Sequence, residues 1–361
     1  MKNLRGTALY CGIGNTIEEI EEHIKEAASV GINAIFTSLQ LPEADKEVLL
    51  RDFPKMAEIA HRYGMVIDAD LSERSAVLFG LDLHDFKAFK KMGVDYARLD
   101  YGFTDQDIVM ASNNEEGIVV ELNAVFATDK WLGKLIEMGV NKEKLHFCHN
   151  YYPMRYTGMT EEELRAANEV IHRYGFKVGG FIPSKTHMRD ACAIGLPTAE
   201  RWREMDTHTV IQEAFMFGLD DVFFGDDFAD ISELKMLAEA DSDVISLRYY
   251  PFCDKELADW LTDRIMNRSY CGTPGKIIRN DFNRQTYKGN VDDTFSCQRR
   301  RGDVTICKST LWRYSGEVQL VCSDLPRDEN IGIIGRIADE DLPLLDTIRL
   351  NNKFRLKFYK N

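Results

Sequence analysis

Short apolar runs alternate with amphipathic segments over the first two-thirds of the chain. Runs rich in branched apolar residues predict buried strands, and apolar positions at helical spacing predict helices between them. This alternation predicts parallel strands that are joined by helical crossovers. We expect eight strands, at residues 6–10, 33–38, 65–70, 96–100, 118–123, 145–150, 177–182 and 221–226.

Glycine recurs at one place in this pattern, between a predicted helix and the strand that follows it. The six glycines are Gly31, Gly64, Gly93, Gly139, Gly175 and Gly218. Glycine suits the left-handed residue that ends many helices, so its recurrence marks a repeated βα unit. Eight such units in about 240 residues predict an α/β fold of the closed (β/α)₈ type, a TIM barrel.

The pattern changes after Asp241. We expect a strand at residues 244–250, a helix at 254–267, and short strands at 275–279, 303–309, 317–322 and 331–337. Short strands separated by turns predict a small β-rich domain. The chain is therefore expected to hold a TIM-barrel catalytic domain at residues 1–241 and a smaller, mostly-β domain at residues 242–361.

Strand parity gathers acidic residues at one end of the predicted barrel. Side chains alternate between the two faces of a strand, and active sites of TIM barrels form at the C-terminal strand ends. In the eighth strand, Asp226 shares its parity with Val222 and Phe224. Each acid can also cap a helix or pair with Arg98. The candidate catalytic residues at strands three, four, five and eight are Asp70, Asp100, Glu121 and Asp226.

Polar side chains near the same strand ends are candidates for binding a substrate. Arg98 shares a face with Asp100 and has the bidentate geometry that suits carboxylate or phosphate, with a structural ion pair as an equal alternative. Asn150 and Tyr152 share parity and offer groups for sugar hydroxyls. Arg189 lies in the long loop after strand seven, where TIM barrels often bind phosphate. The further substrate-binding candidates are Tyr10, Asn123 and Arg336.

Charge and composition narrow the class of protein. Hydrophobic residues make up 44% of the chain, so a sizeable core can form. The formal net charge of -14 argues against a nucleic-acid partner, which needs a basic face. No apolar run reaches the ~18 residues of a membrane span, and the N-terminus does not have the pattern of a secretory signal. We therefore expect no membrane partner.

Cysteine and histidine usage points away from metals and disulfides. None of the eight cysteines forms a C-x-x-C pair, so reduced thiols in a cytoplasmic protein are the simplest interpretation. His146 and His149 differ in parity, so a regular strand does not let them share one metal ion. We expect no metal and no cofactor. A homo-oligomer is compatible with all of these features.

Eight segments carry a resemblance to a known family, at residues 6–10, 33–39, 98–103, 121–123, 148–153, 195–198, 224–226 and 330–336. Together they resemble the MupG-type 6-phospho-N-acetylmuramidase family, long catalogued as a domain of unknown function and often labelled outer surface protein. The resemblance spans nearly the whole chain. It implies a cyclophilin-like barrel for the second domain and a cytoplasmic hydrolase of peptidoglycan recycling.

The substrate implied by the resemblance is 6-phospho-N-acetylmuramic acid linked to N-acetylglucosamine. It carries a phosphate and a lactyl carboxylate, for which Arg189 and Arg336 are the candidate partners. The loop after strand seven departs from the family pattern, because residues 187–193 read HMRDACA in place of an Arg-Gly-Pro run. The exact phosphosugar therefore stays open.

The leading hypothesis is a glycosidase in which one acidic candidate is the general acid and a second is the nucleophile or base. Which two of the four act is open at this point. A separation of about 5–5.5 Å between the two carboxyl groups would indicate retention, and about 6.5–9.5 Å inversion. The alternatives are a metal-dependent isomerase or lyase of phosphosugars and a phosphosugar-binding protein without catalytic activity.

Overall fold

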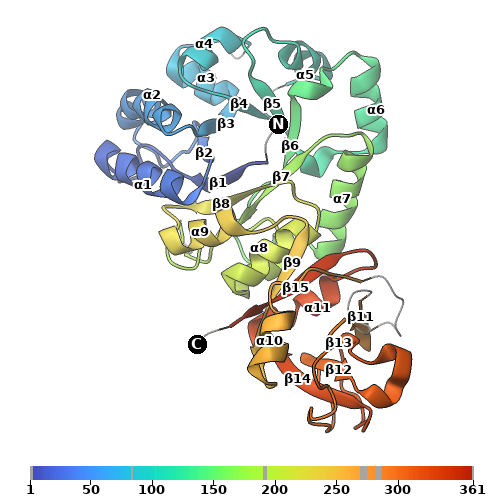
Figure 1. The fold of residues 1–361 in the computed structure, drawn as a ribbon. Coiled ribbons are helices and arrows are strands. Elements are labelled where there is room, and N and C mark those ends of the chain that lie inside the picture. Colours follow the sequence, from blue (N-terminus) through green and yellow to red (C-terminus); the bar gives the residue numbers. More distant parts are fainter. Residues whose placement is uncertain are drawn as a thin grey trace. The chain divides into compact units, whose positions relative to one another are not determined.

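Eight parallel strands close into a barrel in the N-terminal unit, Met1–Ala240 (Figure 1). Each strand pairs with the next one along the chain, and β8 closes the barrel against β1. The predicted TIM barrel is confirmed. The strands are β1 Arg5–Ala8, β2 Ala34–Ser38, β3 Val66–Ser72, β4 Tyr96–Tyr101, β5 Val119–Asn123, β6 Leu145–Cys148, β7 Val178–Ile182 and β8 Asp221–Asp227.

This computed structural model describes residues 3–82, 84–101, 103–189, 193–268, 275–280 and 286–359. For Asp100 and Tyr101 it describes the backbone alone. Among the described residues, no helix has the length and apolar character that crossing a bilayer requires.

Helices surround the barrel and begin at residues that cap them. Thr16 and Glu19 form a reciprocal capping box at α1, as do Thr160 and Glu163 at α7. All six glycines predicted to precede strands have positive φ angles, from 73° to 103°. The helices are α1 Ile17–Val30, α2 Lys46–Arg62, α3 Glu73–Phe79, α4 Phe86–Lys91, α5 Asp105–Ser112, α6 Asp129–Glu137, α7 Glu161–Arg173, α8 Thr207–Met216 and α9 Ile231–Glu239.

The barrel interior has an apolar side and a charged side. Aromatic rings from β2, β7 and β8 pack together, with 4.8 Å between the ring centroids of Phe36 and Phe181 and 5.9 Å between those of Phe181 and Phe223. Strands β3 to β6 instead contribute buried polar groups: Asp68, Arg98, Glu121 and His146. The sequence therefore places ionisable side chains on four consecutive strands, and this half of the barrel is the candidate for a functional site.

The C-terminal unit, Asp241–Asn361, is built on a curled mixed sheet of seven strands in the order β10-β15-β9-β14-β12-β13-β11. Strand β15 runs parallel to β9, and the remaining pairs are antiparallel. The mostly-β character is confirmed. The elements are β9 Val244–Pro251, α10 Lys255–Leu261, β10 Met266–Asn267, β11 Ile277–Arg279, β12 Asp303–Cys307, β13 Val318–Val321, β14 Ile331–Ile337, α11 Leu344–Thr347 and β15 Lys353–Phe358.

One expectation for this unit was wrong, and one strand was missed. The helix expected at residues 254–267 ends at Leu261, because Thr262 is extended and Asp263 has a φ of 59°. Met266 then joins the sheet as part of β10. Strand β15 was not predicted, although its buried Phe354 and Leu356 alternate with charged residues in the pattern of a half-buried strand.

Close packing between β1 and β8 gives a stability prediction. A Cβ atom at Gly6 would lie 2.0 Å from Cδ1 of the buried Phe223 ring, so Gly6→Ala should lower the free energy of unfolding by about 1–3 kcal/mol. The matched control is Gly133→Ala inside α6, where the nearest atom is 3.8 Å away and stability should rise by about 0.5–1 kcal/mol. Urea unfolding measures both changes. Wild-type stability for Gly6→Ala would contradict the packing.

Candidate active site

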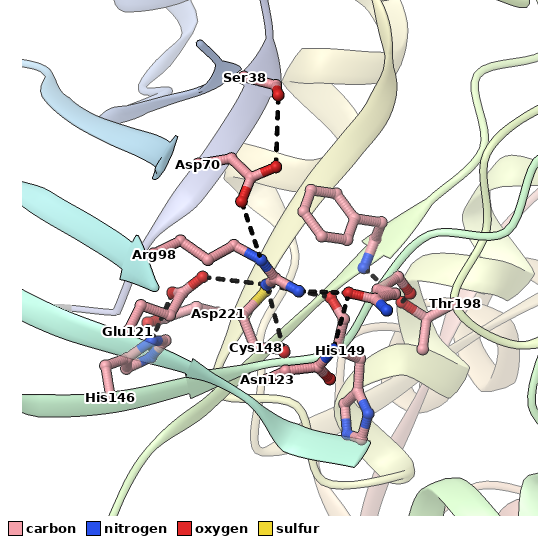
Figure 2. Close-up of polar contacts among 12 residues, drawn as sticks. Ser38, Asp70, Arg98, Glu121, Asn123, His146, Cys148, His149, Thr198 and Asp221 are labelled. Carbon is pink, nitrogen blue, oxygen red and sulfur yellow. Dashed lines mark hydrogen bonds and ion pairs between the residues drawn. The ribbon is translucent and has the colours of Figure 1, made fainter. Parts of the chain in front are cut away.

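The guanidinium of Arg98, on β4, is the hub of a polar network inside the barrel (Figure 2). Its Nη1 atom donates to Oε1 of Glu121 and to the carbonyl oxygen of Cys148, both at 3.2 Å. Its Nη2 atom donates to Oδ1 of Asn150. Its Nε atom lies 3.9 Å from Oδ1 of Asp70. Arg98 is 3% exposed, so these contacts fix its position almost without solvent.

Below Arg98, a chain of buried charges crosses the barrel from β5 to β8. Oε2 of Glu121 lies 2.7 Å from Nδ1 of His146, and Nε2 of His146 lies 2.9 Å from Oδ2 of Asp221. Burial opposes a charge on His146, but its close contacts with the carboxyl groups of Asp221 and Glu121 outweigh burial and raise its pKa to about 10. His146 is therefore a cation held between two carboxylates at neutral pH.

Burial acts differently on the two carboxyl groups nearest to this chain. Burial alone would raise the pKa of Glu121, yet the hydrogen bond from His146 and the charge of Arg98 lower it. Asp68 is fully buried, and neither of its oxygens has a hydrogen-bond partner among the described side chains and backbone. Burial and the neighbouring charge of Glu121 raise the pKa of Asp68. Glu121 is thus ionised, whereas Asp68 favours its neutral form.

Asp70 lies at the end of β3, on the edge of this network. Its Oδ2 atom accepts hydrogen bonds from Nε2 of Gln40 at 2.8 Å and from Oγ of Ser38 at 3.3 Å. Its side chain is 16% exposed, whereas that of Glu121 is 0% exposed. Of these two predicted acids, Asp70 is the one that a ligand at the mouth can reach.

Asp226 serves the loop that follows β7. Its carboxylate accepts the backbone N–H groups of Ser184, Arg189 and Leu196 at 2.9, 2.8 and 3.1 Å. Asp226 is completely buried, and burial raises its pKa to about 6 against the opposing effect of the three hydrogen bonds. Its parity partners, Val222 among them, pack against the helices, so the expectation that Asp226 faces the axis was wrong.

The next residue, Asp227, takes the place expected of Asp226. The pairing of β1 with β8 is irregular at this point, and Asp227 lies opposite Ala8, which belongs to the inner core of the barrel. Oδ2 of Asp227 accepts a hydrogen bond from Nδ2 of Asn15 at 3.3 Å. Burial raises the pKa of this half-buried carboxyl group. Phe223 faces the barrel axis, and Asp227 lies four residues further along the strand. Strand alternation starting from Phe223 would therefore have predicted Asp227 on the inner face.

A cavity of about 420 Å³ opens beside Asp227. His23 and Phe228 form part of its wall, with 4.9 Å between their ring centroids. Burial lowers the pKa of His23 to about 4, so this ring is neutral at physiological pH. The cavity therefore places open space next to a carboxyl group that burial inclines to keep its proton.

Arg189 reaches from the loop after β7 over the aromatic residues of the mouth. Its guanidinium lies 4.1 Å from the ring centroid of Tyr10. Nη1 donates to the hydroxyl of Tyr151 at 3.4 Å, and Nη2 donates to Oε1 of the exposed Glu43 at 2.7 Å. Tyr10 is buried, and its hydroxyl donates to the carbonyl oxygen of Gly225 at 3.2 Å. Two tyrosines thus hold a cation at the barrel mouth.

The predicted amide and phenol groups do not all meet. Nδ2 of Asn123 donates to Oδ1 of Asn150 at 3.2 Å, so both amides belong to the Arg98 network. Tyr152 instead lines a cavity of about 600 Å³ with residues of α7, Glu163 among them. Strand β6 ends at Cys148, which is why parity no longer relates Asn150 to Tyr152.

Two further candidates fall outside this cluster. The Asp100 carboxyl group lies outside the described part of the chain. Arg336 belongs to the C-terminal unit, where its Nη1 atom lies 3.1 Å from Oδ1 of Asp303. In the described ranges, no group of three or more His, Cys, Asp or Glu side chains is arranged to hold a metal ion.

The barrel and its acidic mouth are typical of glycosidases, and comparison with known families gives the assignment. Residues 5–239 match the N-terminal domain of 6-phospho-N-acetylmuramidases, and residues 271–357 match the C-terminal domain. The chain belongs to the 6-phospho-N-acetylmuramidase family and is a glycosidase. This confirms the resemblance found in the sequence, and membership implies a phosphosugar substrate.

Two solved structures resemble the whole chain. An uncharacterised protein of B. cereus is 26% identical, with 99% of each chain covered and a TM-score of 0.87. A conserved Enterococcus faecalis protein of unknown function is 25% identical, with 98% of this chain and 96% of that chain covered and a TM-score of 0.72. No curated protein sequence matches the chain.

The charge chain predicts opposite protonation states for two buried histidines. His146, with a pKa of about 10, should be doubly protonated at pH 8, and His149, whose pKa burial lowers to about 4, should be neutral. NMR of the ring nitrogens measures both states, with His149 as the matched control. A neutral His146 at pH 8 would contradict the interpretation of His146 as a cation between two carboxylates.

The same shift sets a stability trend. The folded pKa of His146 lies above its unfolded value of ~6.5, so the folded state binds an extra proton between these pH values. This contribution is complete below pH ~6.5 and is lost as the pH rises towards about 10, with a slope of up to about 1.4 kcal/mol per pH unit.

Proposed function

We propose that the protein hydrolyses the bond between 6-phospho-N-acetylmuramic acid and N-acetylglucosamine, with Asp227 and Asp70 as the two working carboxyl groups. One observation carries this choice. Glu121 and Asp226 are fully buried and engaged by protein groups, whereas Asp70 and Asp227 are half-buried at the mouth. Hydrolysis of a glycoside needs two carboxyl groups that reach the sugar.

Asp227 is the proposed general acid. A general acid must hold its proton until the glycosidic oxygen needs it, and burial raises the pKa of Asp227 in that direction. The cavity beside it gives room for the departing sugar. Asp227 would donate its proton to the glycosidic oxygen as the bond to the anomeric carbon breaks, and N-acetylglucosamine leaves with that proton.

Asp70 is the proposed nucleophile or base. The positive charge of Arg98, with its Nε atom 3.9 Å from Oδ1, stabilises negative charge on Asp70, and Gln40 and Ser38 orient the other oxygen. In its ionised form, Asp70 would attack the anomeric carbon or take a proton from the attacking water. The configuration of the released sugar distinguishes these two routes.

Arg189 is the proposed partner of the substrate's phosphate or lactyl carboxylate. Its guanidinium is held by Tyr10 and Tyr151, and among the described residues its ionic partner is the exposed carboxylate of Glu43. A phosphate, with a charge of about −1.5 to −2, would compete with Glu43 for this cation. Asn123, Asn150 and Arg98 would then shape the site from below. We further propose that the protein acts in the cytoplasm, in peptidoglycan recycling.

The roles of Asp227 as general acid and of Asp70 as nucleophile or base predict that the two variants depend differently on the leaving group of the substrate. Asp227→Asn and Asp70→Asn should each lower kcat on the disaccharide by a factor on the order of 10³. A 6-phospho-N-acetylmuramyl fluoride needs no proton on its leaving group, so Asp227→Asn should release fluoride at nearly the wild-type rate in the first turnover. Asp70→Asn should fail with both substrates. Steady-state assays on the disaccharide and single-turnover assays of fluoride release, with the purified variants, measure these rates.

Asp243→Asn, at an exposed position of the C-terminal unit, is the matched control and should keep wild-type kinetics. Full activity of either mouth variant on the disaccharide would exclude that residue. If the folded wild-type enzyme cleaves neither the disaccharide nor the fluoride, the proposed function is wrong.

A further inference from the structure

The C-terminal unit has a cavity of its own, of about 480 Å³. This volume falls in the range of small-molecule sites, roughly 300–1,000 Å³. The cavity includes the end of β14, which is part of the glycine-containing segment 330–336 noted in the sequence. Its wall is formed by Phe252, Phe295, Cys297, Gln298, Arg300, Asp303, Ile333 and Arg336.

Two phenylalanine rings stand exposed at this cavity although their backbones are fixed. The N–H of Phe252 donates to the carbonyl oxygen of Ile334 at 2.9 Å, and the carbonyl oxygen of Phe295 accepts from the N–H of Ile333 at 2.7 Å. The residues are nevertheless 61% and 71% exposed. Aromatic rings held in water beside a cavity are typical of a binding surface, because a ligand gains free energy by covering them.

The charged groups of the cavity favour an anion. Asp303 accepts the backbone N–H of Arg300 at 2.6 Å and Nη1 of Arg336 at 3.1 Å. The Nη2 atom of Arg336 also lies 3.6 Å from Oδ1 of the exposed Asp339, so two carboxylates hold Arg336 in place. The exposed Arg300 side chain has no ion pair or hydrogen bond among the described residues. Arg336 is thus paired with carboxylates, whereas the guanidinium group of Arg300 is the cation of the lining that a ligand anion can neutralise.

We propose that this cavity binds a phosphorylated sugar, with the phosphate on Arg300 and Arg336 and the apolar face of the ring against Phe295 and Phe252. Guanidinium groups bind phosphate oxygens through bidentate hydrogen bonds, and Gln298 offers an amide for hydroxyl groups. The choice of a phosphosugar over other anions with an apolar face rests on the proposed function of the barrel.

A local NMR readout tests this site in the full chain, independently of turnover. Ile333 lines the cavity, and its methyl resonance, assigned with Ile333→Val, should shift saturably as 6-phospho-N-acetylmuramic acid is added. N-acetylmuramic acid lacks the phosphate, and inorganic phosphate lacks the sugar ring. Each should bind at least 10-fold more weakly than 6-phospho-N-acetylmuramic acid. An unchanged Ile333 signal at millimolar ligand would overturn the proposal.

Variants separate the two parts of the site. Arg300→Gln should weaken binding of the phosphosugar about 10-fold or more, while Arg313→Gln, at an arginine outside the cavity lining, should leave it unchanged. Phe295→Ala should weaken binding of the phosphosugar and leave that of inorganic phosphate unaltered. Equal affinity in Arg300→Gln and wild type would refute the anion site.

The outcome is distinct from that of the barrel. A saturable Ile333 shift with no hydrolysis of the disaccharide would refute the proposed function and support this site. Hydrolysis of the disaccharide with no shift of the Ile333 signal would support the proposed function and refute this site.

Discussion

The chain of buried charges from Arg98 through Glu121 and His146 to Asp221 is the interaction on which the barrel mouth depends. It joins strands β4, β5, β6 and β8 through groups that are at most 3% exposed. Removing an ion from water costs several kcal/mol unless it is paired, and a lone buried charge destabilises a protein by about 3–5 kcal/mol. Each member therefore requires the others, and together they hold Arg98 in one position beneath the mouth.

This constraint divides the acidic residues of the mouth into two kinds. Glu121 keeps the charges of Arg98 and His146 in balance, and Asp226 organises the loop after β7 through three backbone N–H groups. The carboxyl groups of both residues are engaged in contacts within the protein. Asp70 and Asp227 lie where the network and the loop end, half-buried and open to a ligand. The buried charges and the loop after β7 thus determine which carboxyl groups stay accessible and where a phosphosugar would bind.

The sequence predicted the barrel well because every strand repeats the same local pattern. Parity also placed Asp70 and Glu121 on the inner face, but it could not show that Glu121 is sealed by His146, since that contact depends on how neighbouring strands are staggered. The exchange of Asp226 for Asp227 has a simpler cause. Asp226 shares the face of Val222, which packs against helices, and the irregular pairing of β1 with β8 lies beyond sequence periodicity. Parity also stops where a strand ends, which is why Tyr152 was misplaced relative to Asn150.

Asp70 and Asp227 are proposed as the two carboxyl groups that act on the sugar. A crystal structure of the Asp227→Asn variant with the intact disaccharide bound would test this assignment. The assignment predicts that the side chain at position 227 lies within about 3 Å of the glycosidic oxygen and that the Asp70 carboxylate faces the anomeric carbon. A glycosidic bond bound out of reach of both residues, next to another acid of the mouth, would contradict it.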